Sequence, residues 1–332
     1  MTKIAIVTIY GNDNFGNKLQ NLALQKIVEK NNCEVTTVRY HVAPTNSVMK
    51  NIYIAICSIK TLCRRKKIKR FSDQYLKTSE IVYDVKDKEL LKKYLNSFDY
   101  VLVGSDQVWN STYLRKELLE YFLLSTVVPA KRIAAAPSVA ENFIKDVTLF
   151  KRELPHFKAI SCREIGNIEQ LEEISGKIVV HLSDPTIAVG KGFWNRLIDE
   201  CTMSVPSTKY KLIYTLGQKK ITTVDAINIL DRKSKYYNID PIGFIKLIKY
   251  ADEVITDSYH ATIFSIILNT KVRLIERKGT MSERIKSLFQ DFNIEENTKS
   301  ITIQRDKYSE IEDSIKRKWE DYLNQSIVFK PI

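Results

Sequence analysis

Short apolar strands alternate with helical segments along nearly the whole chain, and this alternation restricts the fold more than any other feature of the sequence. Strand-like runs at residues 3–9, 35–40 and 100–103 are each followed by a turn and by apolar residues at helical spacing. Parallel strands need crossover helices between them, so the pattern predicts a mostly parallel α/β protein. A length of 332 residues favours two domains over one.

The predicted domain boundary lies near Leu154, because Pro155 disrupts a preceding helix and a new alternation of strands and helices starts at Phe157. We therefore expect one Rossmann-like domain at residues 1–154 and a second at residues 155–305. The remaining residues, 306–332, begin with an amphipathic helix whose apolar residues recur at steps of three and four.

A histidine occupies the point where a predicted strand turns into a helix. Residues 253–256 have the pattern of a buried strand, Asp257 and Ser258 are favourable N-cap residues, and an apolar helical face follows. His260 therefore falls in the first helical turn, where unpaired N–H groups and the helix dipole favour a bound anion. Ligands of open α/β sheets bind at this edge. The pattern indicates either proton exchange with an anionic substrate or ordinary core packing.

The formal net charge of +13 raises the local concentration of anionic partners. Part of this charge is concentrated at residues 60–70, directly after the apolar run 52–56. The basic segment is interpreted either as a solvated helix face or as a helix that lies on an anionic membrane surface. No nucleic-acid-binding motif accompanies the charge, so nucleic acid is not an expected partner.

Cysteine and histidine usage argues against a disulfide framework and a metal centre. The five cysteines are scattered and form no C-x-x-C pair, and the four histidines show no metal-ligand spacing. We expect no structural metal and no cofactor. The N-terminus begins a strand at once and no apolar run is long enough to cross a bilayer, so the expected location is cytoplasmic, peripheral to the membrane if the basic segment binds lipid.

Several segments together resemble the polysaccharide pyruvyl transferase family, and they follow one another in order over roughly residues 3–290. Their joint occurrence is much more specific than any single motif. The segments that carry the resemblance are Asn14-Phe15-Gly16-Asn17, Val103-Gly104-Ser105-Asp106-Gln107-Val108-Trp109-Asn110, Ser161-Cys162-Arg163-Glu164, Asp184-Pro185-Thr186 and Thr256-Asp257-Ser258-Tyr259-His260-Ala261-Thr262.

The resemblance implies a fold like that of the glycosyltransferase B enzymes, with two parallel sheets facing a central cleft and a C-terminal helix, 306–332, that returns to the first domain. It also implies an activity, the transfer of pyruvate from phosphoenolpyruvate onto two hydroxyls of a glycan or lipid-linked sugar to form a ketal. Residues 1–154 would then hold the acceptor and residues 155–305 the donor.

The donor site that the resemblance implies centres on His260 as the general acid and base, with Arg163 as the cation that binds the donor. Ser258 and Tyr259 precede the histidine and are assigned to the same site. Some branches of the family carry arginine at the position of Ser258, so this chain needs another cation. Arg277 is the candidate for this role, with Arg284 as a second possibility.

The acceptor residues are expected at the turns after the first strand and after residues 100–103. Asn14, Asn17, Ser105 and Gln107 carry amide or hydroxyl groups that suit hydrogen bonding to a sugar. Each of them also suits local turn structure, since such side chains bond their own backbone.

Two other functions remain open on this sequence. One is a glycosyltransferase that uses a nucleotide sugar on the same fold, since a fold does not determine the chemistry. The other is a relative that binds glycans without catalysing a reaction. The absence of arginine at position 258 fits this second alternative.

Overall fold

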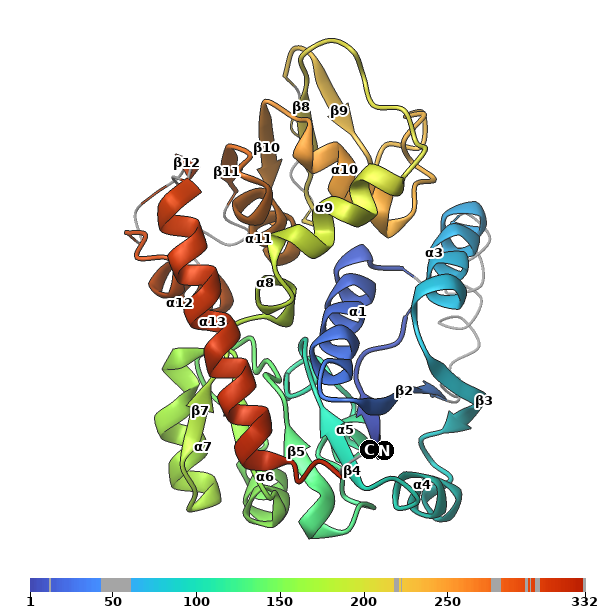
Figure 1. The fold of residues 1–332 in the computed structure, drawn as a ribbon, viewed down its shortest axis with the longest axis vertical. Helices are drawn as coiled ribbons and strands as arrows, with labels where there is room; N and C mark the ends of the chain where they lie inside the picture. Colours follow the sequence, from blue (N-terminus) through green and yellow to red (C-terminus); the bar gives the residue numbers. More distant parts are fainter. Residues whose placement is uncertain are drawn as a thin grey trace.

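The computed structural model describes residues 1–11, 13–42, 61–217, 221, 223–275, 282–295, 298, 300–301 and 305–330. Within these residues the chain forms two parallel α/β units, one above the other, with a long helix along one side of both (Figure 1). The α/β class and the parallel sheets agree with the sequence pattern.

The first unit is built on a five-stranded parallel sheet, within the described residues, of order β3-β2-β1-β4-β5. Its strands are β1 (Thr2–Val7), β2 (Cys33–His41), β3 (Thr78–Asp84), β4 (Tyr100–Val103) and β5 (Arg132–Ala134). Its helices are α1 (Phe15–Glu29), α3 (Leu62–Tyr75), α4 (Lys88–Leu95), α5 (Lys116–Phe122) and α6 (Val147–Glu153). The strand order reverses between β1 and β4.

Strands β6 (Ile160–Cys162) and β7 (Val179–His181), with helix α7 (Ile168–Ser175) between them, continue the first sheet. Ile133 of β5 forms a parallel bridge with Ala159, directly before β6. The sequence interpretation placed this segment in the second domain, because Pro155 disrupts a preceding helix and a new alternation of strands and helices starts at Phe157. Strand pairing instead groups it with the first sheet, so the division between the two sheets falls near Ser183 rather than near Leu154.

The second unit contains another five-stranded sheet among the described residues, of order β12-β11-β10-β8-β9 with β12 antiparallel. Its strands are β8 (Lys211–Tyr214), β9 (Ala226–Asn228), β10 (Glu253–Thr256), β11 (Val272–Leu274) and β12 (Ser300–Ile301). Its helices are α8 (Pro185–Ala188), α9 (Lys191–Glu200), α10 (Pro241–Lys249), α11 (Tyr259–Leu268) and α12 (Glu283–Asp291). This sheet changes direction between β8 and β10.

Helix α13 (Arg305–Ser326) joins the two units. The amphipathic pattern near the end of the sequence predicted the helix, and the family resemblance implied its return to the first domain. In the second unit, the Tyr308 ring stacks on Phe292, with ring centroids 6.0 Å apart. In the first, the Tyr322 hydroxyl donates a hydrogen bond of 2.6 Å to the carbonyl oxygen of Ala134. The helix therefore returns to the first sheet, as expected (Figure 1).

The start of α1 anchors the two units to each other. The Phe15 ring stacks on Phe244 of α10 with centroids 4.9 Å apart, and it also lies 6.2 Å from the Tyr214 ring of β8. All three rings belong to one buried apolar cluster that continues from the first sheet into the second unit. Because burial of aromatic rings is strongly favourable, this cluster fixes the N-terminal end of α1 against the second sheet.

Candidate functional site

The two points at which the sheets change strand order meet at a contact between α1 and α11. Ligands of open α/β sheets bind outside the carboxyl ends of the strands at such points. Gly16, in the first turn of α1, lies against His260, in the first turn of α11. A Cβ atom on residue 16 would fall 2.2 Å from His260 Nδ1, so only glycine fits there. The histidine therefore lies at the seam between the two units.

Helix α11 holds His260 through local hydrogen bonds at its N-terminus. The Ser258 hydroxyl caps the helix by accepting from the Ala261 N–H at 3.5 Å, and the Ser258 N–H donates to Thr256 Oγ1 at 2.9 Å. Ser258 thus has a structural role in the described contacts. The His260 side chain is 7 % exposed. It is buried, but at the domain seam rather than within one apolar core.

Asp184 lies between the predicted catalytic histidine and the predicted donor-binding arginine. Its Oδ2 atom is 3.0 Å from Arg163 Nη2 and 3.6 Å from His260 Nε2. Its Oδ1 atom accepts a hydrogen bond of 2.9 Å from the Thr186 N–H and so caps α8. The carboxylate therefore caps α8 and also contacts the side chains of Arg163 and His260.

Opposite effects of burial and charge set the ionisation of this pair. Burial opposes the charged form of Asp184, but Arg163 and His260 outweigh it and hold the pKa of the carboxyl well below its usual range. Burial also opposes the charged form of Arg163, yet Asp184 raises the pKa of the guanidinium. Asp184 therefore stays anionic and can orient the imidazole and stabilise positive charge on it.

Two guanidinium groups contact the ring of Tyr259. The Cζ atoms of Arg163 and Arg284 each lie 5.2 Å from the ring centroid. Burial is the main reason that the pKa of Arg284 is lowered; Asp106 counteracts this effect, and repulsion from Arg163 adds to it. Two like charges held close together favour a bound anion. Arg284, on α12, is thus a second cation beside Arg163, and its role in donor binding stays a prediction.

Arg284 is held from the opposite side of the seam. In the amide orientation that satisfies both side chains, Gln107 Oε1 accepts hydrogen bonds from Nη1 and Nη2 of Arg284 at 2.7 and 2.6 Å. Gln107 follows β4 in the first unit, so this contact bridges the two units. The other candidate cation, Arg277, lies outside the described residues.

The turn after β4 brings Ser105 and Asp106 to the same place. The Ser105 hydroxyl bonds Arg163 Nη2, and the Ser105 side chain is fully buried. The turn requires glycine at position 104, where φ is 132° and a Cβ atom would fall 2.0 Å from the carbonyl oxygen of Ala135. Asp106 has a positive φ of 83° and is 4 % exposed. Sequence reasoning missed Asp106, although its neighbours were predicted as acceptor ligands.

The two asparagines of the first turn lie beside the histidine contact. Asn14 caps α1, since its Oδ1 atom accepts a hydrogen bond of 2.8 Å from the Gly16 N–H. Asn17 is half-buried in the first turn of the helix, and its carbonyl oxygen accepts from Gln20 Nε2 at 3.1 Å. Their position at the seam is compatible with acceptor binding, which stays a prediction.

Lys18 is a buried cation that the sequence interpretation did not identify. Its side chain is 0 % exposed and Nζ lies 3.5 Å from the centroid of the Tyr10 ring. Within the described part of the chain, Nζ forms no hydrogen bond. Burial lowers the pKa of Lys18 to about 7. The charged form of Lys18 therefore destabilises the folded protein.

Most of the predicted basic segment lies on α3. The helix buries Ile68 and Phe71 in the core, whereas Lys66, Lys67 and Arg70 are exposed. A helix packed through its apolar side chains fits the solvated-face interpretation. The preceding apolar run, 52–56, lies outside the described residues, and contact with a membrane stays untested.

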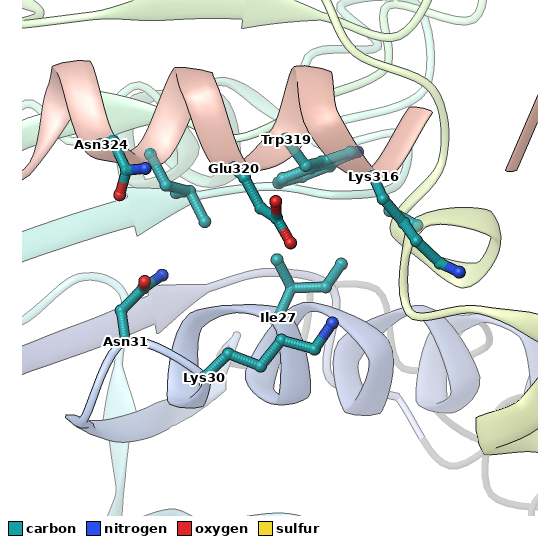
Figure 2. Close-up of a pocket in the computed structure, with 9 residues that line it drawn as sticks. Ile27, Lys30, Asn31, Lys316, Trp319, Glu320 and Asn324 are labelled. Atoms are coloured by element: carbon teal, nitrogen blue, oxygen red, sulfur yellow. The ribbon is translucent and has the colours of Figure 1, made fainter. Parts of the chain in front are cut away.

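A separate cavity of about 270 Å³ lies between α1 and α13. Figure 2 shows Lys30 and Asn31 at the C-terminal end of α1, facing Glu320 and Asn324 of α13. Eleven residues of helix separate Ile27, on the cavity wall, from Gly16, a distance of about 16 Å. The cavity is thus remote from the histidine contact and contains none of the predicted site residues.

No cluster of three or more histidine, cysteine, aspartate or glutamate side chains in the described part of the chain has an arrangement that could hold a metal ion. No described helix is both long enough and apolar enough to span a bilayer.

Several solved structures are similar to this chain over most of its length. A Klebsiella pneumoniae protein of uncharacterised function is 11% identical, with 91% of this chain and 93% of that chain covered and a TM-score of 0.52. A Listeria monocytogenes protein assigned as a UDP-N-acetylglucosamine 2-epimerase is 11% identical, with 98% and 90% covered and a TM-score of 0.52. S. aureus MnaA in complex with UDP is 13% identical, with 98% and 92% covered and a TM-score of 0.48.

Two Rossmann-like units whose ligand-binding edges face each other, closed by a returning helix, make this an α/β protein of the glycosyltransferase B-like class. No curated protein matches the sequence. The family model for polysaccharide pyruvyl transferase matches residues 14–279, and the chain belongs to this family.

Proposed function

We propose that this protein transfers the pyruvyl group of phosphoenolpyruvate onto two hydroxyls of a glycan or lipid-linked sugar. The observation that best supports the proposal is the group formed by His260, Asp184 and Arg163 at the seam of the two units. It combines a proton-exchanging imidazole, a carboxylate that orients it, and a cation suited to an anionic donor.

The donor carries a phosphate and a carboxylate, and the two arginines offer free N–H groups to them. Nε and Nη1 of Arg163 and Nε of Arg284 are buried and form no hydrogen bond among the described residues. A buried polar group without a partner is costly, so a ligand that accepts these hydrogen bonds gains binding energy. Arg284 supplies a positive charge where Ser258 cannot.

Ketal formation is balanced in protons. The methylene carbon gains one proton, two carbon–oxygen bonds form to the acceptor, and the bond between C2 and the phosphate oxygen breaks. The acceptor loses two hydroxyl protons in the reaction. One of them balances the proton that the methylene carbon gains, and the other leaves with the phosphate. His260 donates to the methylene carbon and is reprotonated by the second hydroxyl.

The acceptor approaches from the first unit in this proposal, where Asn14, Asn17 and Ser105 lie beside the seam. The protein works in the cytoplasm, and an anionic membrane surface would be contacted electrostatically through the exposed side chains of α3. Vesicle flotation tests this last point: binding that requires anionic lipid and is lost at high salt supports it, whereas no lipid dependence leaves α3 a solvated surface.

The test is to incubate the protein with phosphoenolpyruvate and a panel of nitrophenyl glycosides and lipid-linked sugars. Mass spectrometry should detect a product heavier by pyruvate less water, with release of phosphate. His260→Gln should reduce phosphate release by about 10²–10⁴-fold. His156→Ala is the control, because His156 is exposed and outside the site. Transfer of sugar from a nucleotide sugar, with no ketal formed, would instead support the glycosyltransferase alternative.

A further inference from the structure

Asp106 has a free carboxylate oxygen at the seam. The side chain is only 4 % exposed. Its Oδ1 atom accepts a hydrogen bond of 2.8 Å from the Gln107 N–H, whereas Oδ2 is buried and has no hydrogen-bond partner in the ranges that the structure describes. A buried carboxylate oxygen without a partner is expensive to maintain, which calls for a ligand at this position.

The residues on either side of Asp106 each bind one of the two guanidinium groups. Ser105 bonds Arg163, and Gln107 bonds Arg284. The negative charge of Asp106 acts to raise the pKa of both guanidinium groups. Within the described residues, however, the carboxylate forms an ion pair with neither arginine. A small anion bound by the arginines would therefore lie close to the free Oδ2 atom.

The other titratable groups of this region have partners of their own or stay neutral. The negative charge of Glu164 also acts to raise the pKa of both arginines. Its carboxylate accepts hydrogen bonds from the Ser138 hydroxyl and, at 2.9 Å, from the Val139 N–H. Asp184 is paired with Arg163 and His260. Burial raises the pKa of the Tyr259 hydroxyl well above its ordinary value. Burial also raises the pKa of the Tyr40 hydroxyl, and the charge of Asp106 adds to this effect.

Within the function proposed above, on which this inference rests, we infer that Asp106 is the base that deprotonates the first attacking acceptor hydroxyl. As the hydroxyl oxygen bonds to C2 of the donor, its proton passes to Oδ2 of Asp106. The same proton then leaves with the phosphate when the bond from C2 to the phosphate oxygen breaks, and the carboxylate is restored. Asp106 therefore serves the first hydroxyl and His260 the methylene carbon and the second hydroxyl.

The test uses Asp106→Asn, because asparagine tolerates the positive φ of 83° and cannot act as a base. With phosphoenolpyruvate and the nitrophenyl glycoside that the wild-type protein pyruvylates best, kcat should fall by about 10²–10⁴-fold while KM for phosphoenolpyruvate does not rise. The loss of rate at acidic pH, which protonation of a base causes in the wild-type protein, should disappear. Asp87→Asn, at the N-cap of α4, is the matched control.

A second variant separates catalysis from folding. Asp106→Gly suits the positive φ and leaves room for a small carboxylate, so added formate should restore part of its activity. Activity of Asp106→Asn within a few-fold of the Asp87→Asn control would overturn the inference. So would a loss that leaves the pH profile unchanged and that formate does not restore in Asp106→Gly. If the wild-type protein forms no ketal on any glycoside of the panel, the proposed function fails, and the assignment of Asp106 falls with it.

Discussion

Gly16 of the first unit and His260 of the second are in contact so close that a single added carbon on residue 16 would overlap the imidazole. The ideal Cβ position lies 2.2 Å from Nδ1 and 2.4 Å from Cγ of the histidine. The carbons of the ring are attached to a buried helix that cannot shift freely, because α11 is buried along its whole length. The glycine therefore sets the position of the histidine relative to the first sheet.

Gly16→Ala should displace the imidazole and reduce ketal formation by at least about 10-fold, while lowering stability by about 1–3 kcal/mol through overpacking. Gly192→Ala is the matched control, because Gly192 lies in α9 and a Cβ atom there meets nothing within 4 Å. That substitution should stabilise the helix slightly. Thermal unfolding and phosphate release measure both effects, and equal activity of the two variants would contradict the role of Gly16.

Asp184→Asn should destabilise the protein by about 3–5 kcal/mol, because it leaves the buried guanidinium of Arg163 without its counter-ion. Asparagine can still cap α8, so the loss of stability measures the contribution of the negative charge alone. Since the pKa of the carboxyl is lowered in the fold, its stabilisation is fully present above the unfolded pKa of about 3.9 and is lost as the pH falls below that value.

The stability difference between wild type and Asp184→Asn should accordingly stay constant above about pH 5 and shrink in more acidic solution, as urea unfolding can measure. Asp240→Asn serves as the control, since Asp240 caps α10 and forms no ion pair in the described part of the chain. A difference that grows on acidification would show that Asp184 does not stabilise the fold through its charge.

Lys18→Met should stabilise the protein below pH 7. The folded pKa of about 7 is lower than the ordinary lysine value, so the unfolded chain binds more protons between the two values and stability rises with pH in that window. Removing the lysine should raise the free energy of unfolding by on the order of 3 kcal/mol near pH 6, and this increase should shrink toward about pH 10. Lys26→Met, on the exposed side of the same helix, should show no such trend in denaturant unfolding.

Arg284→Gln should raise KM for phosphoenolpyruvate by about 10–100-fold, because one charge-assisted contact to the donor is lost. Arg273→Gln, in the same unit, removes an arginine that pairs with Glu253 at 3.2 Å and is 43% exposed. Steady-state kinetics with varied donor concentration separate the two variants. An unchanged KM in Arg284→Gln would remove this arginine from the donor site.

Local patterns predicted the fold well where strands are buried on both faces. Strands β4 and β10 occur at the residues that the apolar runs indicated, Tyr100–Val103 and Glu253–Thr256. The place of β6 within the two sheets was not predictable from a local pattern. Its pairing beside β5 depends on contacts across the sheet, whereas the local signal at Pro155 favoured a domain boundary.

The site was predictable only in part, for a similar reason. His260 and Arg163 follow strands directly, and such positions can be recognised from the order of residues. Arg284 was only the second possibility for the cation and Asp106 was not identified, because their surroundings depend on contacts between the two units. The burial of the Lys18 ammonium group likewise results from its packing over the Tyr10 ring. No periodicity or spacing in the chain encodes those contacts.

An anionic three-carbon donor that binds at the seam between the two units should stabilise the folded protein, and thermal unfolding with and without the donor measures this effect. A ligand that binds only the native state at about 100 times its Kd stabilises it by about 2.7 kcal/mol. Phosphoenolpyruvate should raise the melting temperature of the wild-type protein clearly more than that of Arg284→Gln, and UDP-N-acetylglucosamine should have little effect on either. Stabilisation by the nucleotide sugar with no response to phosphoenolpyruvate would contradict the account.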